Sequence, residues 1–343
     1  MAQFNEKNKS NNLQPFISIC TPTFNRRPFI PYLIKCVEYQ TYPKDRMEWI
    51  VIDDGTDKIQ DIFKDNTIVN FSNMPEIKYF KYNNQMTLGR KRNIMHDKCS
   101  GSIIIYMDDD DYYPPERVSH AVEMLIANPN ALCAGSSEMH IYFDHIKTIY
   151  QCGPYGPNHS TAATFAFRKE LLNHVRYDDK SAVAEEKHFL KNYTIPFVQL
   201  DTTKTIMVFS HIHNSVDKKT LIDCQNKYIK VSNKNITDFI KNKLLKEFYI
   251  DNLNTILLSY PLGKPSLKPE MMKQIDNLIE ERKKLEVPMQ EMYQQMHAQM
   301  NAQITEMRTS HEKVIANKDI LINALMKQNK ELKTANTLLN NNR

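Results

Sequence analysis

An acidic cluster directly follows an apolar strand within Gly101–Pro115, and this pairing constrains the fold more than any other feature of the sequence. Residues 102–107 form a short run rich in β-branched side chains, which is typical of a strand buried on both faces of a parallel sheet. Four aspartates, Asp108 to Asp111, come next, before two tyrosines and two prolines that end regular structure. Since ligands of open α/β sheets bind at the carboxyl ends of strands, the pattern predicts a site at this edge.

The four consecutive carboxylates repel one another unless a cation neutralises them. Mg²⁺ and Mn²⁺ prefer oxygen ligands and often bind one or two carboxylates together with the phosphates of a substrate. We therefore expect a divalent-metal site at Asp108–Asp111. The alternative is a solvated acidic turn.

Strand and helix patterns alternate through the first part of the chain. We expect strands at residues 16–20, 49–52, 77–82 and 102–107, and helices at 28–40, 88–99 and 116–127. Further strands are expected at 131–150 (two strands), 161–167 and 205–209. This alternation predicts an α/β domain with a mostly parallel central sheet.

Charged side chains also follow the second strand and open the second helix. Asp53 and Asp54 precede a glycine at a strand end, where a carboxylate can accept from a ribose hydroxyl or a base N–H; a plain Asp-Gly turn is the alternative. Residues 90–92 (Arg-Lys-Arg) stand in the first turn of a helix, where they oppose its dipole. A diphosphate beside the aspartates would compensate them, unless the turn is simply exposed.

Two later segments carry further chemistry. Glu185 and Glu186 open a predicted helix, so one of them is a candidate general base, with a structural helix start as the alternative. His211 and His213 are two residues apart in an extended stretch and can share a face. One of them can complete the metal site, while a structural role is the alternative.

Four motifs together resemble those of the family-2 glycosyltransferases, which have the GT-A fold. The resemblance covers about residues 16–214. The motifs are TPTFNR at 21–26, VIDDGT at 51–56, the Arg90–Asn93 segment and YMDDDD at 106–111. The resemblance implies a GT-A nucleotide-sugar-binding domain that transfers a sugar, with inversion, from a nucleotide-diphosphate sugar to an acceptor hydroxyl. The implied donor is a UDP-sugar, the cofactor Mn²⁺ or Mg²⁺, and the acceptor an unknown glycan or protein.

The resemblance also implies a role for individual residues. Thr21, Asn25 and Arg26 are expected to line the nucleotide pocket, with Asp53 or Asp54 near the base and Arg92 near the nucleotide.

In the acidic motif, Asp108 is expected to face the ribose and Asp110 to bind the metal. Asp109 is a further donor-binding candidate, and the extra Asp109 and Asp111 leave the register open by one residue. The family places a Glu-Asp pair, with its second member as base, where this chain has Glu185–Glu186, so Glu186 is the expected base with a side chain one methylene longer.

The C-terminal part is expected to be helical. Residues 218–260 and 271–285 have helical patterns, and we expect Pro288 to interrupt the second. From Tyr293 onward, apolar residues recur at heptad spacing without glycine or proline, which predicts a coiled coil and a homo-oligomer; a single amphipathic helix folded back on the domain is the alternative. The expected division is a disordered arm (1–14), a GT-A domain (15–217), a helical extension (218–287) and a coiled coil (288–343).

Composition restricts the partners and the compartment. Hydrophobic residues make up 41% and charged residues 25%, a profile typical of a soluble globular protein. The net charge of +5 is dispersed, so nucleic-acid binding is not expected. There is no signal-peptide pattern and no apolar run long enough to span a membrane. Six cysteines without a CxxC pair indicate a reducing, cytoplasmic location (host cytoplasm or virion, if viral). Low glycine and high Asn, Lys and Ile usage is typical of AT-rich genomes, including those of large DNA viruses.

Two other functions remain open at this point. A metal-dependent nucleotidyltransferase or phosphohydrolase on the same kind of sheet would release a nucleoside monophosphate and pyrophosphate instead of a nucleoside diphosphate. A structural protein, assembled by the coiled coil and carrying an inactive transferase domain, would not bind UDP with Mn²⁺; the intact set of carboxylates argues against it.

Overall fold

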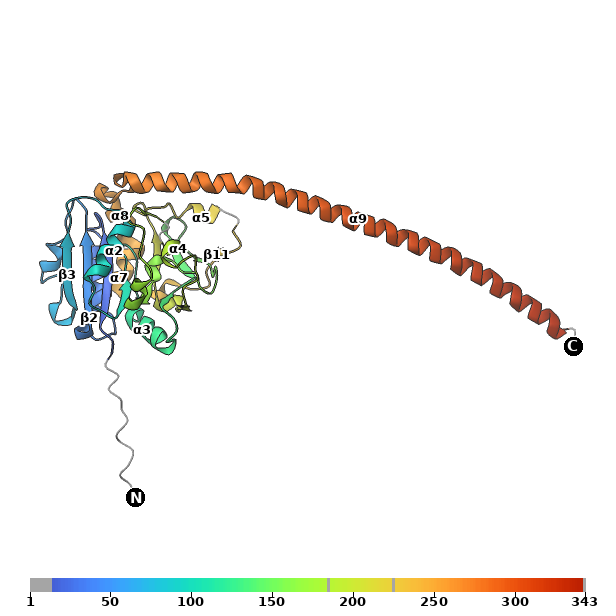
Figure 1. Cartoon of the computed structure of the whole chain (residues 1–343), viewed down its shortest axis with the longest axis horizontal. Coiled ribbons are helices and arrows are strands. Elements are labelled where there is room, and N and C mark those ends of the chain that lie inside the picture. Colours follow the sequence, from blue (N-terminus) through green and yellow to red (C-terminus); the bar gives the residue numbers. More distant parts are fainter. Residues whose placement is uncertain (1–13, 184–185, 224–225, 342–343) are drawn as a thin grey trace, which may run out of the picture. The chain divides into compact units, whose positions relative to one another are not determined.

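The computed structural model describes residues 14–183, 186–223 and 226–341 (Figure 1). The expected N-terminal arm therefore lies almost wholly outside the described residues. The chain divides into two compact units, residues 1–275 and 276–343.

Unit 1 contains a seven-stranded sheet in the order β3-β2-β1-β4-β8-β5-β9. Its strands are β1 (Ile17–Thr23), β2 (Met47–Asp53), β3 (Glu76–Lys81), β4 (Ile103–Tyr106), β5 (Cys133–Gly135), β8 (Ala166–Arg168) and β9 (Phe197–Gln199). The first four strands in the sheet order run parallel, as expected, but β8 is antiparallel to both β4 and β5. The fold is thus α/β with a mixed sheet.

The alternation of side chains explains how helices cover both faces of this sheet. Ile17 and Ile19 of β1 point to a core shared with α1 (Ile30–Glu38) and α3 (Arg117–Ala127). Cys20 points to the opposite core, shared with α2 (Leu88–Lys98), which packs against β1 and β2. Every residue of β1 and β2 is buried, as the apolar runs predicted.

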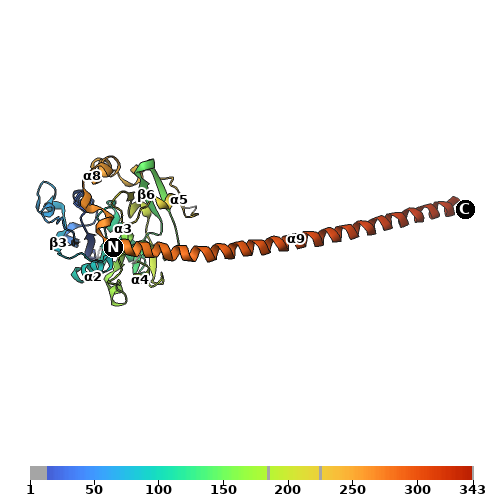
Figure 2. The same ribbon diagram turned by 90° about the horizontal axis from the view of Figure 1, so that it is seen from above.

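A second, four-stranded sheet has the order β10-β6-β7-β11. Its strands are β6 (Met139–Phe143), β7 (Thr148–Cys152), β10 (Val208–Ser210) and β11 (Ile229–Val231). β3 and β6 lie on opposite sides of the unit (Figure 2).

Several expected boundaries in this region are wrong. Residues 131–150 hold the starts of three strands instead of two, and the strand expected at 161–167 begins only at Ala166, after a 3₁₀ turn at Ala162–Thr164. β11 lies inside the stretch expected to be helical. Its three residues form a strand there because they pair antiparallel with β7. Such short strands are decided by their partners more than by their own sequence.

The rest of the expected helical extension is a series of short helices. They are α5 (Thr220–Asp223), α6 (Ile236–Phe239), α7 (Lys243–Lys246), a π-helix (Glu247–Asn252) and α8 (Leu253–Leu258); α4 (Glu186–Phe189) lies earlier, in the expected GT-A domain. Phe248 and Tyr249 are buried, and Phe248 stacks on Tyr32 at 3.5 Å between ring centroids. Leu244 is 48% exposed.

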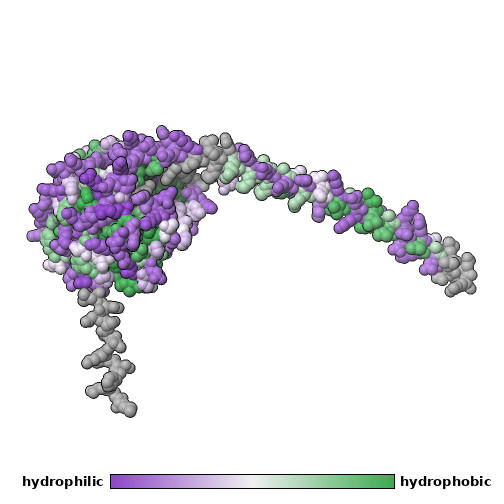
Figure 3. Space-filling view, in the orientation of Figure 1, coloured by the Kyte–Doolittle hydropathy of each residue, from purple (hydrophilic) through white to green (hydrophobic). Residues whose placement is uncertain are grey.

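Unit 2 consists of the long helix α9, which spans Pro269–Asn341 and begins in unit 1. The expected interruption at Pro288 is wrong: the helix continues through it, which an interior proline permits at a cost of about 3 kcal/mol. Apolar side chains at the heptad positions, such as Met300, Ile304 and Leu325, are exposed along this helix (Figure 3).

Across the described residues, the molecule has no helix with the length and apolarity that a membrane span needs.

Candidate functional site

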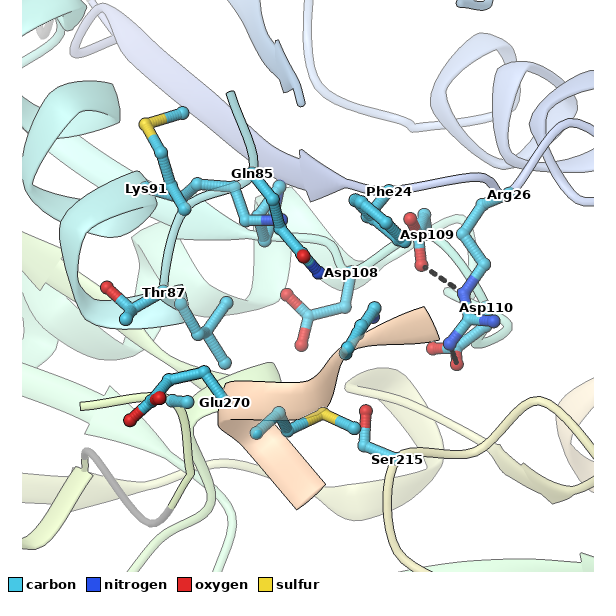
Figure 4. Close-up of a pocket in the computed structure, with 16 residues that line it drawn as sticks. Phe24, Arg26, Gln85, Thr87, Lys91, Asp108, Asp109, Asp110, Ser215 and Glu270 are labelled. Atoms are coloured by element: carbon cyan, nitrogen blue, oxygen red, sulfur yellow. Dashed lines mark hydrogen bonds and ion pairs between the residues drawn. The ribbon is translucent and has the colours of Figure 1, made fainter. Parts of the chain in front are cut away.

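A pocket of about 270 Å³ opens beyond the carboxyl ends of β1 and β4 (Figure 4). It is lined by Pro22, Phe24, Arg26, Gln85, Met86, Thr87, Leu88, Lys91, Asp108, Asp109, Asp110, Ala182, Ser215, Lys268, Glu270 and Met271. Parallel strands end together at this edge, so side chains that are distant in sequence meet here, as the acidic motif predicted.

Three of the four clustered aspartates line this pocket. Asp109 and Asp110 face Arg26, with Oδ1 of Asp109 3.5 Å from Nε and Oδ2 of Asp110 3.4 Å from Nη2. Asp108 Oδ2 lies 3.5 Å from Arg92 Nη2. Asp111 is instead buried behind the loop, and its main-chain carbonyl accepts from the Tyr249 hydroxyl at 2.8 Å.

The protein environment separates the acidities of these carboxyl groups. Burial raises the pKa of Asp109 to about 6, although Arg26 opposes this shift. Burial, together with the charge of Asp110, also raises the pKa of Asp111 well above its usual value. For Asp110, burial acts in the same direction, but a hydrogen bond from His211 and the charge of Arg26 outweigh it and hold the pKa far below its usual value. Asp110 is therefore better kept charged for a cation than Asp109 or Asp111.

Arg26 leaves β1 in a loop that the structure fixes tightly. Its guanidinium is 4% exposed and also donates to the carbonyls of His213 (2.7 Å) and Gly263 (3.1 Å). Asn25, at a φ of 52°, accepts from the main-chain N–H of Asp57 and so shapes the loop from behind the pocket wall. Thr21 is buried and does not line the pocket. Its hydroxyl donates to the Met107 carbonyl and so links β1 to the end of β4.

The two aspartates after β2 also act from behind the pocket. Asp53 accepts from the N–H groups of Gly55 (2.9 Å) and Ile59 (3.2 Å), which organises the loop after β2. Asp54 accepts from the N–H of Met86 at 2.6 Å and pairs with Lys91 at 2.8 Å. It thereby holds in place two residues that do line the pocket.

Of the basic turn that opens α2, Lys91 reaches the pocket, while Arg92 lies under it. Arg92 is 1% exposed, and its guanidinium carbon lies 4.3 Å from the centroid of the Tyr106 ring. The first turn is capped by Thr87, whose side chain accepts from the N–H of Arg90. Lys91 therefore lines the pocket directly, whereas the expected Arg92 reaches it through Asp108.

The two expected histidines lie close to the acidic loop and are buried. His211 Nδ1 accepts from the main-chain N–H of His213 at 3.2 Å, while its Nε2 lies 3.4 Å from Asp110 Oδ2. Burial lowers the pKa of each histidine to about 4. Both ring nitrogens of His213 are buried without a hydrogen-bond partner among the described residues.

A divalent cation fits this site when a phosphate-bearing ligand contributes. Within residues 14–183, 186–223 and 226–341, no group of three acidic, histidine or cysteine side chains converges as a complete metal site. Asp110 offers a charged oxygen ligand that His211 orients, and Mg²⁺ and Mn²⁺ often bind through one or two carboxylates plus substrate phosphates.

Of the expected catalytic pair, only Glu186 is among the described residues. Glu185 lies outside the described residues, and Glu186 begins α4 as a partly buried residue. Glu186 is not among the pocket residues, whereas Ala182, four positions earlier, is.

Several pocket residues were not expected from the sequence, above all Phe24 and Lys268. The Phe24 ring centroid lies 5.9 Å from Lys91 Nζ and 5.3 Å from Lys268 Nζ. Burial, with repulsion from Arg26 and Lys91, lowers the pKa of Lys268 to about 7. Phe24 belongs to the TPTFNR motif, so the sequence places it in the loop after the first strand. Lys268, more than 200 positions downstream, has no local sequence signal that links it to the site.

Comparison with known proteins locates a family within this unit. Residues 18–176 match the sequence profile of glycosyl transferase family 2. The chain is 33% identical over 123 residues to the GalNAc(5)-diNAcBac-PP-undecaprenol beta-1,3-glucosyltransferase of Campylobacter jejuni, covering 34% of this chain and 35% of that protein. It is 26% identical over 110 residues to the poly(ribitol-phosphate) beta-N-acetylglucosaminyltransferase TarS of Staphylococcus aureus, covering 32% and 18%. The chain thus spans less than half the length of the curated relatives it matches.

Solved structures resemble the chain more distantly. S. aureus TarS in complex with UDP-GlcNAc has a TM-score of 0.42 at 18% identity, covering 56% of this chain and 58% of that one. The mannosyltransferase PcManGT of Pyrobaculum calidifontis, in complex with GDP-Man and Mn²⁺, has a TM-score of 0.44 at 16% identity, covering 55% of each chain.

Proposed function

Residues 18–176 belong to glycosyl transferase family 2, and from this premise we propose that the protein moves a sugar from a nucleotide-diphosphate sugar to an acceptor hydroxyl, with inversion. The observation that carries the proposal is the pocket at the sheet edge, where Arg26 and Lys91 stand opposite Asp108–Asp110. Such a pocket offers cations for a diphosphate and carboxylates for a ribose or a cation. We propose a UDP-sugar as the donor, in keeping with the motif resemblance, and an unidentified glycan or protein as the acceptor.

The pocket cations would bind and orient the diphosphate. Arg26 is held rigidly by two main-chain carbonyls, and Lys91 by Asp54, so both present preorganised charge. Asp110, with His211 beside it, would hold Mn²⁺ or Mg²⁺. The cation, when bound, neutralises charge on the leaving diphosphate.

Glu186 is the proposed general base. It would take the proton of the acceptor hydroxyl as that oxygen bonds to the sugar carbon, while the bond from this carbon to the diphosphate breaks. Glu185 would contribute to acceptor binding. This assignment rests on the motif and on the placement of Glu186 at the start of α4.

Thr21, Asn25, Asp53, Asp54 and Arg92 are proposed to position the donor site from behind. Each is buried. Thr21, Asn25, Asp54 and Arg92 contact strand ends or loops at the pocket, and Asp53 organises the loop after β2. Their loss would then weaken binding through displaced neighbours.

We further propose that α9 joins copies of the chain through a coiled coil from residue 288 onward. The exposed apolar side chains at heptad positions support this, because an isolated polar helix would not need them.

A cytoplasmic location is proposed from the cysteines: Cys20 and Cys99 have Sγ atoms 3.3 Å apart, and both are free thiols.

A screen of UDP-, GDP- and dTDP-sugars for Mn²⁺-dependent hydrolysis tests the function, since many transferases slowly use water as acceptor. Release of a nucleoside diphosphate and free sugar is expected. Release of a nucleoside monophosphate and pyrophosphate would instead establish nucleotidyl transfer, and an absence of both turnover and UDP binding would favour a structural protein with an inactive domain.

A further inference from the structure

A segment that lies beyond the family-matched residues forms one wall of the pocket. Residues 260–275, termed the strap, contain two 3₁₀ turns (Pro261–Gly263 and Pro265–Leu267) and the first turns of α9. The strap belongs to the same compact unit as the pocket. It contributes Lys268, Glu270 and Met271 to the lining (Figure 4).

The strap is fastened at its first end to the loop that carries Arg26. Asn25 Nδ2 donates to the Leu262 carbonyl at 3.0 Å, and Arg26 Nη1 donates to the Gly263 carbonyl at 3.1 Å. The contact at Gly263 is close: a Cβ atom there would lie 2.4 Å from Nδ1 of His213. The strap therefore meets the pocket loop through main-chain carbonyls, at a glycine where a side chain would clash with His213.

The other end of the strap is fastened across the pocket. Gln274 Oε1 accepts from the N–H of Ala182 at 2.8 Å, and its Nε2 donates to the Lys180 carbonyl at 2.8 Å. Met271 and Ile275 pack on Ala182 in a small apolar cluster. Lys268 lies between these two attachments, so its backbone is fixed from both sides.

Lys268 has fewer oppositely charged partners than the other two cationic side chains of the pocket, Arg26 and Lys91. Lys91 pairs with Asp54, and Arg26 with Asp109 and Asp110. For Lys268, no ion pair with a carboxylate is present in the described part of the chain, and its close contact is the face of Phe24. Glu270, on the same strap, also lines the pocket.

Arg26 and Lys91 repel the Lys268 ammonium, while Asp109 and Asp110, which attract it, are already paired with Arg26, so a bound anion would stabilise its charge. We propose that Lys268 is a donor-binding residue whose ammonium contacts the diphosphate of the nucleotide-sugar, so that the strap completes the donor site. This inference rests on the proposed function. It extends the donor site to a residue more than 90 positions beyond the end of the family match.

Calorimetric titration of Lys268→Met with UDP and with GDP tests this inference, with Mn²⁺ present. Loss of one charge-assisted hydrogen bond predicts a Kd for the bound nucleotide about 10- to 100-fold weaker than in the wild type. The matched control is Lys273→Met, which removes the same charge from an exposed position on the same strap and should leave Kd unchanged. Lys268→Arg, which keeps the charge, should bind within about threefold of the wild type.

The results of these titrations distinguish a failure of the Lys268 assignment from a failure of the proposed function. Wild-type protein that binds neither UDP nor GDP would overturn both. A wild type that binds, with Lys268→Met equal to Lys273→Met, would overturn the inference alone. Uridine, which lacks phosphates, tests for a merely structural role: equal losses for uridine and UDP would contradict a diphosphate contact. Lys268→Gln serves in the same titrations where the methionine variant does not fold.

Discussion

His211 Nε2 lies 3.4 Å from Asp110 Oδ2, and this contact places a histidine as well as Arg26 beside Asp110. Burial raises the pKa of both Asp109 and Asp111, whereas His211 and Arg26 overcome the same effect at Asp110. A ligand for a divalent cation must be charged, which favours Asp110 over Asp109 and Asp111 as the proposed ligand.

Asp110→Asn should therefore lower Mn²⁺-dependent turnover by at least about 100-fold and weaken UDP binding in the presence of Mn²⁺. The matched control is Asp111→Asn, because Asp111 lies behind the pocket and its raised pKa makes a neutral amide a close replacement. Turnover and calorimetric Kd of both variants check this. An Asp110→Asn protein that binds UDP and Mn²⁺ like the wild type would exclude Asp110 as the ligand.

Glu186→Gln should reduce sugar transfer by roughly 10² to 10⁴-fold while leaving donor binding intact, because it keeps the size of the side chain and removes the basic oxygen. Glu185→Gln should be milder and affect acceptor affinity more than rate, since adjacent helical residues point about 100° apart. Rates at saturating donor and the Kd for UDP separate these effects. The assignment fails if Glu185→Gln is the inactive variant.

The elements that could be predicted were those whose signal is local. β1, β2 and β4 are buried runs of apolar residues, and the aspartates at the end of β4 follow directly from that strand. The bounds of β8 and the existence of β11 could not be predicted, because three-residue strands depend on the neighbours they pair with.

The same distinction applies within the site. Residues of the TPTFNR and YMDDDD motifs line the pocket, but a motif does not say which of its side chains faces the pocket. Thr21 and Arg92 turn into the core, while Lys91, next to Arg92, reaches the pocket. Lys268 directly precedes Pro269, the first residue of α9, and no local signal says that this helix start faces the pocket.

Acid should destabilise the fold partly through His96. This residue is buried beside Tyr106, and burial lowers its pKa to about 3 from an ordinary value of 6.5. Below pH 6.5 the unfolded chain takes up a proton that the folded protein does not, so stability is full above pH 6.5 and falls toward pH 3. From pH 6.5 to 5, this histidine alone accounts for about 2 kcal/mol.

Urea unfolding of the wild type and His96→Asn at pH 7 and pH 5 measures this contribution. The free energy of unfolding of the variant should change less with pH than that of the wild type. His174→Asn, at an exposed position, is the control and should keep the wild-type pH dependence. Equal pH dependence in His96→Asn and the wild type would contradict the assignment.

Deletion of residues 288–343 should leave a folded domain with donor binding but lower its oligomeric state, because the heptad positions lie in this part of α9. Light scattering measures the mass per particle. A point variant avoids truncation: Leu325→Lys, at a core position, should dissociate the oligomer, and Ala316→Lys, on the opposite face, should not. An unchanged mass after the deletion would rule out this coiled coil.

UDP binding should consume protons near neutral pH. Burial, with Arg26 and Lys91 nearby, lowers the pKa of Lys268 to about 7 from an ordinary value of 10.5, so much of it is neutral at pH 7.5 in the free protein. A bound diphosphate favours the ammonium form and raises this pKa. Proton uptake should therefore accompany binding above pH 7, and affinity should fall as pH rises further, by up to about tenfold per unit.

Calorimetry at pH 7.5 in HEPES and in Tris, whose ionisation enthalpies differ, counts the protons taken up. The wild type should show a buffer-dependent enthalpy that Lys268→Met lacks, while Lys273→Met should retain it. At pH 7.5 the diphosphate itself is largely ionised, so its own titration adds little and is common to all three proteins. Uptake that persists in Lys268→Met would assign the proton to another group, because the methionine side chain has no site to receive it.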